Sequence, residues 1–291
     1  MTLLTVAQAL RQAESRGLER LDAQLLLLHA LAKSAQQRAW LLSHDTDELP
    51  APVQAALEAA VQRRAGGEPL AYITGHQEFF GLDLRVDARV LVPRPDTETL
   101  VDWALALLEA ASVSQTPGEA HALRALDLGT GSGAIALALK ATRPTLDVSA
   151  VDFSVDALAV AQANAQRLGL ALALQWHQGS WLAALPQNTA RFDLIVSNPP
   201  YIAAQDAHLP ALTHEPLQAL ASGADGLDDI RQIISQAPAH LRPGGWLLLE
   251  HGYDQATAVR ALLLDAGLSA VQSRRDLSGI ERCSGGHVRQ D

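Results

Sequence analysis

The sequence predicts an α/β protein in which a Rossmann-like, doubly wound sheet follows a small bundle of helices, with a β-hairpin as linker. From residue 124 onward, short apolar runs alternate with amphipathic helical runs, which is typical of a parallel sheet covered by helices on both faces. Before residue 70, apolar residues recur at helical spacing instead. We therefore divide the chain into a helical domain at 1–70, a hairpin linker at 71–93 and an α/β domain at 94–291.

The composition fits a folded protein of the reducing cytoplasm. The 291 residues are 48% apolar, enough for a sizeable core, and a net charge of −10 opposes general attraction to nucleic-acid phosphates. A lone cysteine, Cys283, excludes a disulfide within the chain. No run of about 18 apolar residues could cross a membrane, and the N-terminus turns polar too early for a secretory signal. We expect a cytoplasmic protein with no membrane contact and no direct nucleic-acid partner.

Short helical patterns, joined by polar residues, fill the first 70 residues. These runs are 5–17, 22–34, 36–44 and 51–67. Asp22 is placed to cap the second run. Helices joined this closely predict a small bundle.

A change of pattern predicts the hairpin. Residues 76–93 are aromatic and β-branched, they alternate in "LDLRV", and Gly81 lies in mid-run. A helix restarts in "PRPDTETLVDWALALLEA", with Asp96 or Thr97 as its expected N-cap.

Strand-like and helix-like runs alternate through the rest of the α/β domain. Strands are expected at 124–129, 146–152, 172–178, 192–197 and 245–252, and helices at 133–141, 155–169, 228–241 and 255–267. Ligands of such sheets bind at the carboxyl ends of the strands. Three unusual segments occur there: a glycine-rich loop, an acid, and the stretch Asn-Pro-Pro-Tyr.

The glycine-rich loop "LDLGTGSGA" follows the first strand of the sheet domain. Gly129, Gly131 and Gly133 allow a sharp turn and a close backbone approach to a ligand. The spacing Gly-x-Gly-x-x-Ala satisfies the dinucleotide fingerprint, and Asp152 ends the next strand, where a ribose-binding carboxylate is expected. These residues alone allow either NAD or another adenosyl cofactor. A glycine-rich turn without a ligand is disfavoured because three features coincide.

Other chemistries fit the sequence poorly. Ser132 is not a nucleophile elbow, because Thr130 and Ala134 stand where glycines are needed. Lys140 lacks the spacing of a phosphate-binding loop. The histidines show no metal-ligand spacing, so no metal is expected.

The segment "SNPPY" at 197–201 ends an apolar strand. Proline cannot donate a backbone hydrogen bond, so the strand must stop there, either in a stiff turn or in a polar clamp beside an aromatic ring. Together with the glycine loop and Asp152, this segment resembles class I S-adenosylmethionine-dependent methyltransferases that methylate planar nitrogens. The motif "NPPY" is shared by protein-glutamine methyltransferases and adenine-N6 DNA methyltransferases.

Four longer segments resemble the release factor glutamine methyltransferases, the PrmC/HemK family. They are Tyr72 to Val101, "DLGTGSGAIALAL", "EPLQALASGADGLDDI" and "LRPGGWLLLEHGYDQ". The resemblance spans nearly the whole chain, and "PRPDTE" together with "NPPY" is specific. It implies an enzyme of translation termination that uses S-adenosyl-L-methionine to methylate N5 of the glutamine in the GGQ motif of class I peptide chain release factors.

The resemblance also implies roles for residues. The expected cofactor-binding residues are Gly129, Thr130, Gly131, Ser132, Gly133, Asp152, Trp181 and Asn198. Among them the glycine loop would line the methionine end, Asp152 would accept from the ribose hydroxyls, and Trp181 would lie along the adenine. Many relatives carry an acid just before this aromatic residue, whereas this chain has Ser180, which leaves the adenine amino group a weaker acceptor or a backbone oxygen.

Asn198, Pro199 and Tyr201 are the expected catalytic residues, and Pro200 joins them in binding substrate. A primary amide offers two N–H donors. The Asn198 side-chain oxygen and the Pro199 carbonyl could accept them, while Tyr201 packs against the flat amide. Both bonds would strengthen as positive charge develops on nitrogen during transfer.

The helical domain and hairpin would dock the release factor, and Arg94 and Glu98 would order their junction with the sheet domain. Two other readings stay open: an adenine-N6 nucleic-acid methyltransferase, and a nucleotide-binding oxidoreductase or sensor. The acidic balance and the lack of a basic segment oppose the first. Hydride transfer gives no reason for the Asn-Pro-Pro stretch, which opposes the second.

Overall fold

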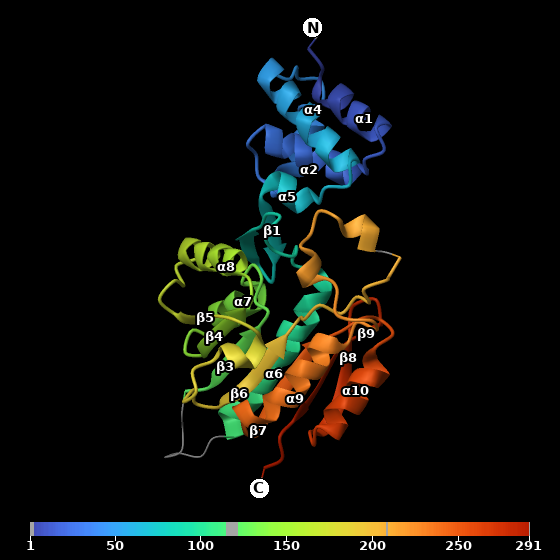
Figure 1. The fold of residues 1–291 in the computed structure, drawn as a ribbon. Coiled ribbons are helices and arrows are strands. Elements are labelled where there is room, and N and C mark those ends of the chain that lie inside the picture. Colours follow the sequence, from blue (N-terminus) through green and yellow to red (C-terminus); the bar gives the residue numbers. More distant parts are fainter. Residues whose placement is uncertain (1–2, 115–121, 208, 291) are drawn as a thin grey trace. The chain divides into compact units, whose positions relative to one another are not determined.

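The computed structural model describes residues 3–114, 122–207 and 209–290. The chain divides into two compact units, Met1–His76 and Gln77–Asp291 (Figure 1). No helix in the described ranges is both long enough and apolar enough to cross a membrane.

The first unit is helical. Its elements are α1 (Val6–Ser15), α2 (Arg20–Ala30), the 3-10 turn η1 (Ala35–Gln37), α3 (Arg38–Ser43), α4 (Ala51–Ala65) and α5 (Leu70–Thr74). Thr5 begins α1 with a capping box, in which its hydroxyl and the Gln8 side chain each accept from the other's backbone N–H. The helices close over a core that includes Val6, Leu26, Leu27 and Leu57.

The expected cap of α2 is wrong. This helix begins at Arg20 with Glu19 at the N-cap, so Asp22 lies inside its first turn. There the carboxylate of Asp22 pairs with Arg64 of α4 at 2.6 Å. The Asp22 side chain, which the local pattern predicts as a helix cap, therefore forms a tertiary ion pair instead.

The second unit holds a seven-stranded sheet within the described ranges. Its strands are β3 (Arg124–Leu128), β4 (Asp147–Asp152), β5 (Leu174–Gln178), β6 (Phe192–Ser197), β7 (Leu241–Glu250), β8 (Ser269–Arg275) and β9 (Glu281–His287). They lie in the order β5-β4-β3-β6-β7-β9-β8. Neighbours from β5 to β7 pair in parallel, as the sequence predicts.

The antiparallel strands β8 and β9 are an addition to the predicted sheet. Strand β9 reads Glu-Arg-Cys-Ser-Gly-Gly-His, which is a poor strand pattern because glycine and polar residues dominate it. Yet β9 pairs on both sides, and a Cβ on Gly285 would be 2.5 Å from the Leu247 carbonyl oxygen. The glycine therefore permits a close approach to β7.

Helices cover both faces of this sheet (Figure 1). On one face α6 (Glu98–Ser114), α7 (Ala134–Thr142) and α8 (Val155–Arg167) pack with strand residues such as Ala125 and Leu248. On the other face α9 (Asp228–His240) and α10 (Ala256–Asp265) pack with Leu126 and Leu247. Alternate residues of β3 and β7 thus enter opposite cores, as a sheet buried on both sides requires.

The hairpin consists of β1 (His76–Phe79) and β2 (Leu82–Arg85). It lies inside the predicted linker 71–93: α5 (Leu70–Thr74) occupies the start of that range, and residues 86–93 follow β2 without forming a strand. Phe80 and Gly81 make the turn with φ of 50° and 76°. Phe79 and Leu84 enter the core under α6 and α7.

The start of α6 differs from the expected capping. Pro95–Thr97 form a short 3-10 turn, η2, and α6 begins at Glu98. Asp96 instead lies 3.6 Å from Arg282 in an ion pair, while Thr97 is buried and contacts Asn198.

Candidate active site

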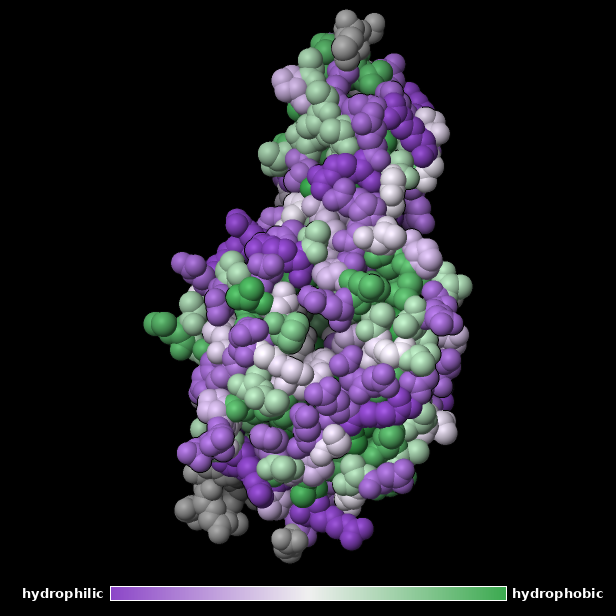
Figure 2. Space-filling model, in the orientation of Figure 1, coloured by the Kyte–Doolittle hydropathy of each residue, from purple (hydrophilic) through white to green (hydrophobic). Residues whose placement is uncertain are grey.

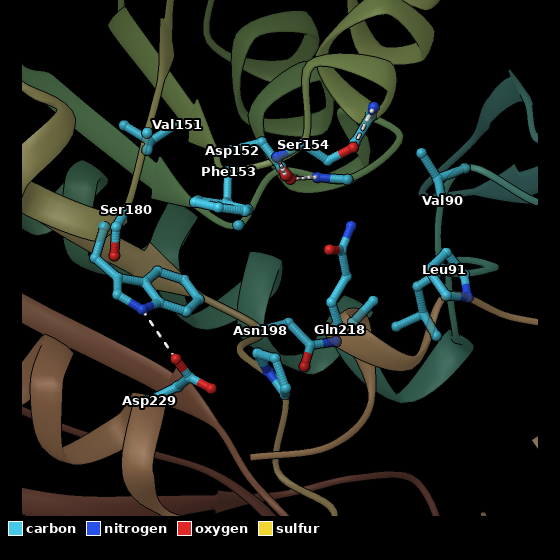
Figure 3. A pocket seen from close by; sticks show the side chains of 18 of the residues that line it. Val90, Leu91, Val151, Asp152, Phe153, Ser154, Ser180, Asn198, Gln218 and Asp229 are labelled. Carbon is cyan, nitrogen blue, oxygen red and sulfur yellow. Dashed lines mark hydrogen bonds between the residues drawn. The ribbon is translucent and has the colours of Figure 1, made fainter. Parts of the chain in front are cut away.

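A pocket of about 300 Å³ opens at the carboxyl ends of β3, β4, β5 and β6 (Figure 3). Strand order reverses between β3 and β6, so this is the topological switch point where α/β sheets bind ligands. Of the predicted site residues, Gly129, Gly131, Asp152, Trp181, Asn198 and Pro200 line the pocket, and so does Ser180.

The glycine loop approaches the pocket with its backbone. Gly129 and Gly131 have φ of 72° and 56°, which L side chains rarely adopt. The Gly131 N–H donates to Asp152 Oδ2 at 2.8 Å. Since neither glycine has a side chain, a ligand can approach this turn closely.

The other three residues predicted in the loop are not among those lining the pocket. Thr130 and Ser132 are buried, and Gly133 stands at the N-cap of α7. The Thr130 hydroxyl donates to Asp127 Oδ2 at 2.7 Å, and the Ser132 carbonyl accepts from Asn164 at 2.9 Å. In this structure they shape the turn, and their contact with a cofactor stays a prediction.

Asp152 faces the pocket from the end of β4 (Figure 3). Besides the Gly131 bond, its Oδ1 accepts from the Ser154 N–H at 2.8 Å. Burial raises the pKa of Asp152, while these backbone bonds oppose the rise. A carboxylate has about four lone-pair sites, so it can accept from a ligand hydroxyl as well.

Trp181 begins the 3-10 turn η3 (Trp181–Ala184) after β5, with φ of 46°, an unusual value for a bulky residue. Its indole N–H donates to Asp229 Oδ1 at 3.0 Å. Asp229 Oδ2 in turn accepts from the Ser222 hydroxyl at 2.6 Å (Figure 3 shows the indole bond).

Asp229 also lines the pocket, yet sequence reasoning missed it as a site residue. Its signal was faint: it is one of two acids in the first turn of α9, where acids are common.

The "NPPY" residues divide between pocket and interior. Asn198 and Pro200 line the pocket, while Pro199 is buried. The Asn198 amide donates from Nδ2 to Thr97 Oγ1 at 3.2 Å. The Tyr201 hydroxyl donates to Glu250 Oε1 at 3.4 Å, and burial followed by the Glu250 charge raises the pKa of Tyr201. Tyr201 is not among the lining residues, so its packing against a substrate amide stays a prediction.

Two buried acids stand behind the pocket. Burial raises the pKa of Asp127 to about 7, against hydrogen bonds from Thr130 and the Ala136 N–H. Burial also raises the pKa of Glu250 to about 7, against a hydrogen bond from Thr97 and the charge of Arg282. Both carboxyl groups therefore keep their protons to a higher pH than an exposed carboxyl group does.

"PRPDTE" contributes contacts around the same pocket. Arg94 pairs with Glu215 Oε2 at 2.5 Å, and Glu215 Oε1 accepts from the Val92 N–H at 3.1 Å. Glu98 accepts from the Phe80 N–H of the hairpin turn at 2.9 Å. The motif thus ties hairpin, α6 and the loop before α9 together, and Glu215 is a further residue that sequence reasoning missed.

Apolar side chains are exposed near this pocket. Phe153, which lines it, is 68% exposed, and Leu217, between the lining residues Pro216 and Gln218, is 64% exposed. Figure 2 shows one face of the molecule, where hydrophobic patches are separated by hydrophilic residues. In the ranges that the structure describes, no group of three or more His, Cys, Asp or Glu could hold a metal ion.

Comparison with known proteins decides the family. The model of the PrmC N-terminal domain matches residues 2–75, and that of the methyltransferase small domain matches residues 101–262. A release factor glutamine methyltransferase of Bordetella pertussis is 50% identical over 274 residues, which cover 94% of this chain and 96% of that protein. The chain belongs to the release factor glutamine methyltransferase family.

Other relatives agree with this family. A release factor glutamine methyltransferase of Xylella fastidiosa is 48% identical over 280 residues, 96% of each chain. Among solved structures, a Pyrococcus furiosus methyltransferase covers 73% of this chain and 91% of its own, with a TM-score of 0.51 at 18% identity. The N-terminal domain of human METTL16 in complex with SAH covers 72% and 76%, with a TM-score of 0.52 at 17% identity. The predicted family and the class I methyltransferase fold are thereby confirmed.

Proposed function

We propose that this family member methylates N5 of the glutamine in the GGQ motif of class I peptide chain release factors, with S-adenosyl-L-methionine as methyl donor. The observation that carries the proposal is a single pocket lined by Gly131, Asp152 and Asn198. A cofactor-type loop and the motif for a planar nitrogen thus face one space, as methyl transfer between two ligands requires.

Gly129 and Gly131 would hold the methionine end of the cofactor, and Asp152, whose carboxylate lines the pocket, would accept from its ribose hydroxyls. Trp181 would lie along the adenine, and Asp229 holds that indole in place. When bound, S-adenosylmethionine supplies an activated methyl group on a sulfonium.

The substrate amide is bound at the mouth of this pocket by the proposed clamp. One N–H donates to Asn198 Oδ1 and the other to the Pro199 carbonyl. An amide nitrogen is a poor nucleophile because its lone pair is delocalised, so catalysis depends on orientation and on acceptors that stabilise the developing positive charge. Pro200 fixes Pro199 in an extended conformation, which suits this arrangement.

Recognition of the release factor is assigned to the first unit and the hairpin. The names of the relatives imply release factors as their substrates. The first unit contributes no residue to the lining of the pocket described above, which leaves its surface for recognition. Since release factors act on the ribosome, the proposed place of action is the cytoplasm.

The test is a labelling experiment with radioactive S-adenosylmethionine. The acceptors are a class I release factor, the same factor with its GGQ glutamine changed to glutamate, and duplex DNA. We expect label on the wild-type factor alone, because a carboxylate has no N–H pair for the clamp. Label on the glutamate variant would contradict the clamp, and label on DNA would favour adenine methylation instead.

A further inference from the structure

A buried polar chain lies behind Asn198. Asn198 Nδ2 donates to Thr97 Oγ1 at 3.2 Å, and Thr97 also hydrogen-bonds to the Glu250 carboxyl group. The Tyr201 hydroxyl reaches Glu250 Oε1 at 3.4 Å. Thr97 is 4% exposed and Glu250 is 1% exposed, so solvent does not compete for these bonds.

The number of protons available to Thr97 and Glu250 decides which group donates in each of these hydrogen bonds. A threonine hydroxyl carries one proton, and the Glu250 carboxyl group can only accept once it has lost its own proton, above a pKa of about 7. If Thr97 gives its proton to Glu250, it can only accept from Asn198. The NH₂ end of the Asn198 amide must then face Thr97, which leaves Oδ1 for the pocket that Asn198 lines.

We propose that Thr97 and Glu250 are positioning residues that fix the Asn198 amide with its oxygen toward the substrate N–H. The inference rests on the proposed function. Asparagine has a donor end and an acceptor end of nearly equal size, so packing alone does not choose between them. A flipped Asn198 would present its own donor to the substrate's donor, and the clamp would lose its acceptor before transfer begins.

The burial of Glu250 supports this role. Its Oε2 atom is buried and has no hydrogen-bond partner among the described residues, which is unfavourable for the folded state. Arg282 stabilises its charge, whereas Asp96 opposes it. Burying this carboxyl group costs stability. Its hydrogen bonds to Thr97 and Tyr201 give a reason for the burial, because through Thr97 it orients the Asn198 amide.

Paired substitutions at Thr97 provide the kinetic test. Thr97→Val keeps the branched shape and removes the hydroxyl, whereas Thr97→Ser keeps the hydroxyl. We expect Thr97→Val to lower kcat on the release factor about tenfold or more, part of what a lost preorganised acceptor costs. KM and cofactor affinity should change far less, and Thr97→Ser should retain most of the rate. In the Asn198→Ala background, Thr97→Val should cause little further loss, because Thr97 acts through Asn198.

A measurement without substrate separates this inference from the proposed function. The chain has three asparagines, Asn164, Asn188 and Asn198, so ¹⁵N-asparagine labelling gives three side-chain NH₂ pairs. Asn164 donates both protons to carbonyls, and Asn188 is exposed, so each pair has a distinct environment. Asn198→Ala identifies the third pair.

We expect the Asn198 pair to exchange slowly in the wild type, to shift and exchange faster in Thr97→Val, and to recover in Thr97→Ser. The Asn164 pair reports whether the fold is intact. An Asn198 pair unchanged by Thr97→Val would overturn the inference, whatever the rate. If the wild type labels no release factor, the proposed function fails, while the NMR result still decides how Asn198 is oriented.

Discussion

Gly129 lies against the indole of Trp181: a Cβ atom added to Gly129 would be 3.2 Å from Trp181 Cζ3. The indole N–H is held by its hydrogen bond to Asp229. The glycine loop and the turn after β5 therefore fit together as one wall of the pocket.

Replacing Gly129 with alanine should weaken binding of S-adenosylmethionine by tenfold or more. The added Cβ meets the indole, and φ of 72° is unfavourable for alanine by about 1–2 kcal/mol. Calorimetric titration measures the loss. Gly279→Ala is the matched control, because Gly279 has φ of 81° with no atom within 4 Å of its added Cβ. Gly279→Ala should lower stability by a similar amount and leave binding intact. Equal losses of binding in both variants would contradict the claim that Gly129 and Trp181 together form one wall of the pocket.

Asp152→Asn should lower affinity for S-adenosylmethionine by roughly 1–3 kcal/mol, the scale for a polar group left without its partner. The amide can still accept from the Gly131 N–H, but it presents one acceptor oxygen where the carboxylate presents two. Asp156→Asn, at an exposed position in the first turn of α8, is the control and should bind normally. Tight binding of NAD with no response to S-adenosylmethionine would point to the oxidoreductase alternative.

Asn198→Ala should slow methylation of a release factor about a hundredfold, or about 3 kcal/mol, because a preorganised acceptor for the reacting amide is lost. Cofactor affinity should change much less, since the proposed partner of Asn198 is the substrate. Steady-state kinetics and titration on the same preparation separate the two effects. Asn188→Ala, at an exposed position, should behave as the wild type. A loss confined to cofactor binding would contradict the clamp.

Removing the first unit should separate recognition from cofactor binding. A chain that starts at Gln77 keeps the whole second unit, including every residue that lines the pocket. We expect near-normal affinity for S-adenosylmethionine, which also shows that the fragment folds, and loss of most activity on intact release factor. Full activity of this fragment on intact release factor would contradict the proposal that the helices of the first unit bind the release factor.

Asp127→Asn should change how stability depends on pH. Burial raises the pKa of Asp127 to about 7. Between about pH 4 and pH 7 the unfolded acid releases its proton while the native acid keeps it, so the wild type loses stability as pH rises through this window. At about 1.4 kcal/mol per pKa unit, the loss is on the order of 4 kcal/mol.

The asparagine variant lacks that titration. Its free energy of unfolding, relative to the wild type, should therefore rise from pH 4 to pH 7 and then level off. Denaturant titrations across this range measure the difference. Asp265→Asn, at an exposed position, shows what loss of a surface carboxylate contributes. A difference for Asp127→Asn that does not vary with pH would contradict a buried, protonated acid.

Local patterns were sufficient for most of the fold. Strand-helix alternation predicted β3 to β7 and the helices between them, because a buried strand is a short apolar run, whereas the apolar residues of an amphipathic helix recur at helical spacing. The glycine loop, Asp152 and Asn198 could be predicted as neighbours because the carboxyl ends of parallel strands meet at one edge of a sheet. The pair β8–β9 could not, because the glycine and polar residues of β9 give a weak strand signal.

Tertiary structure decided which side chains support the site. Thr97 was expected as a helix cap, yet its hydroxyl contacts Asn198, 101 residues away. Asp229 binds Trp181 across 48 residues, and Glu215 binds Arg94 across 121. A short polar side chain can form a local cap or a distant bond with similar energy. Which one it forms depends on the partner that the folded chain brings within about 3 Å, and no local pattern records that distance.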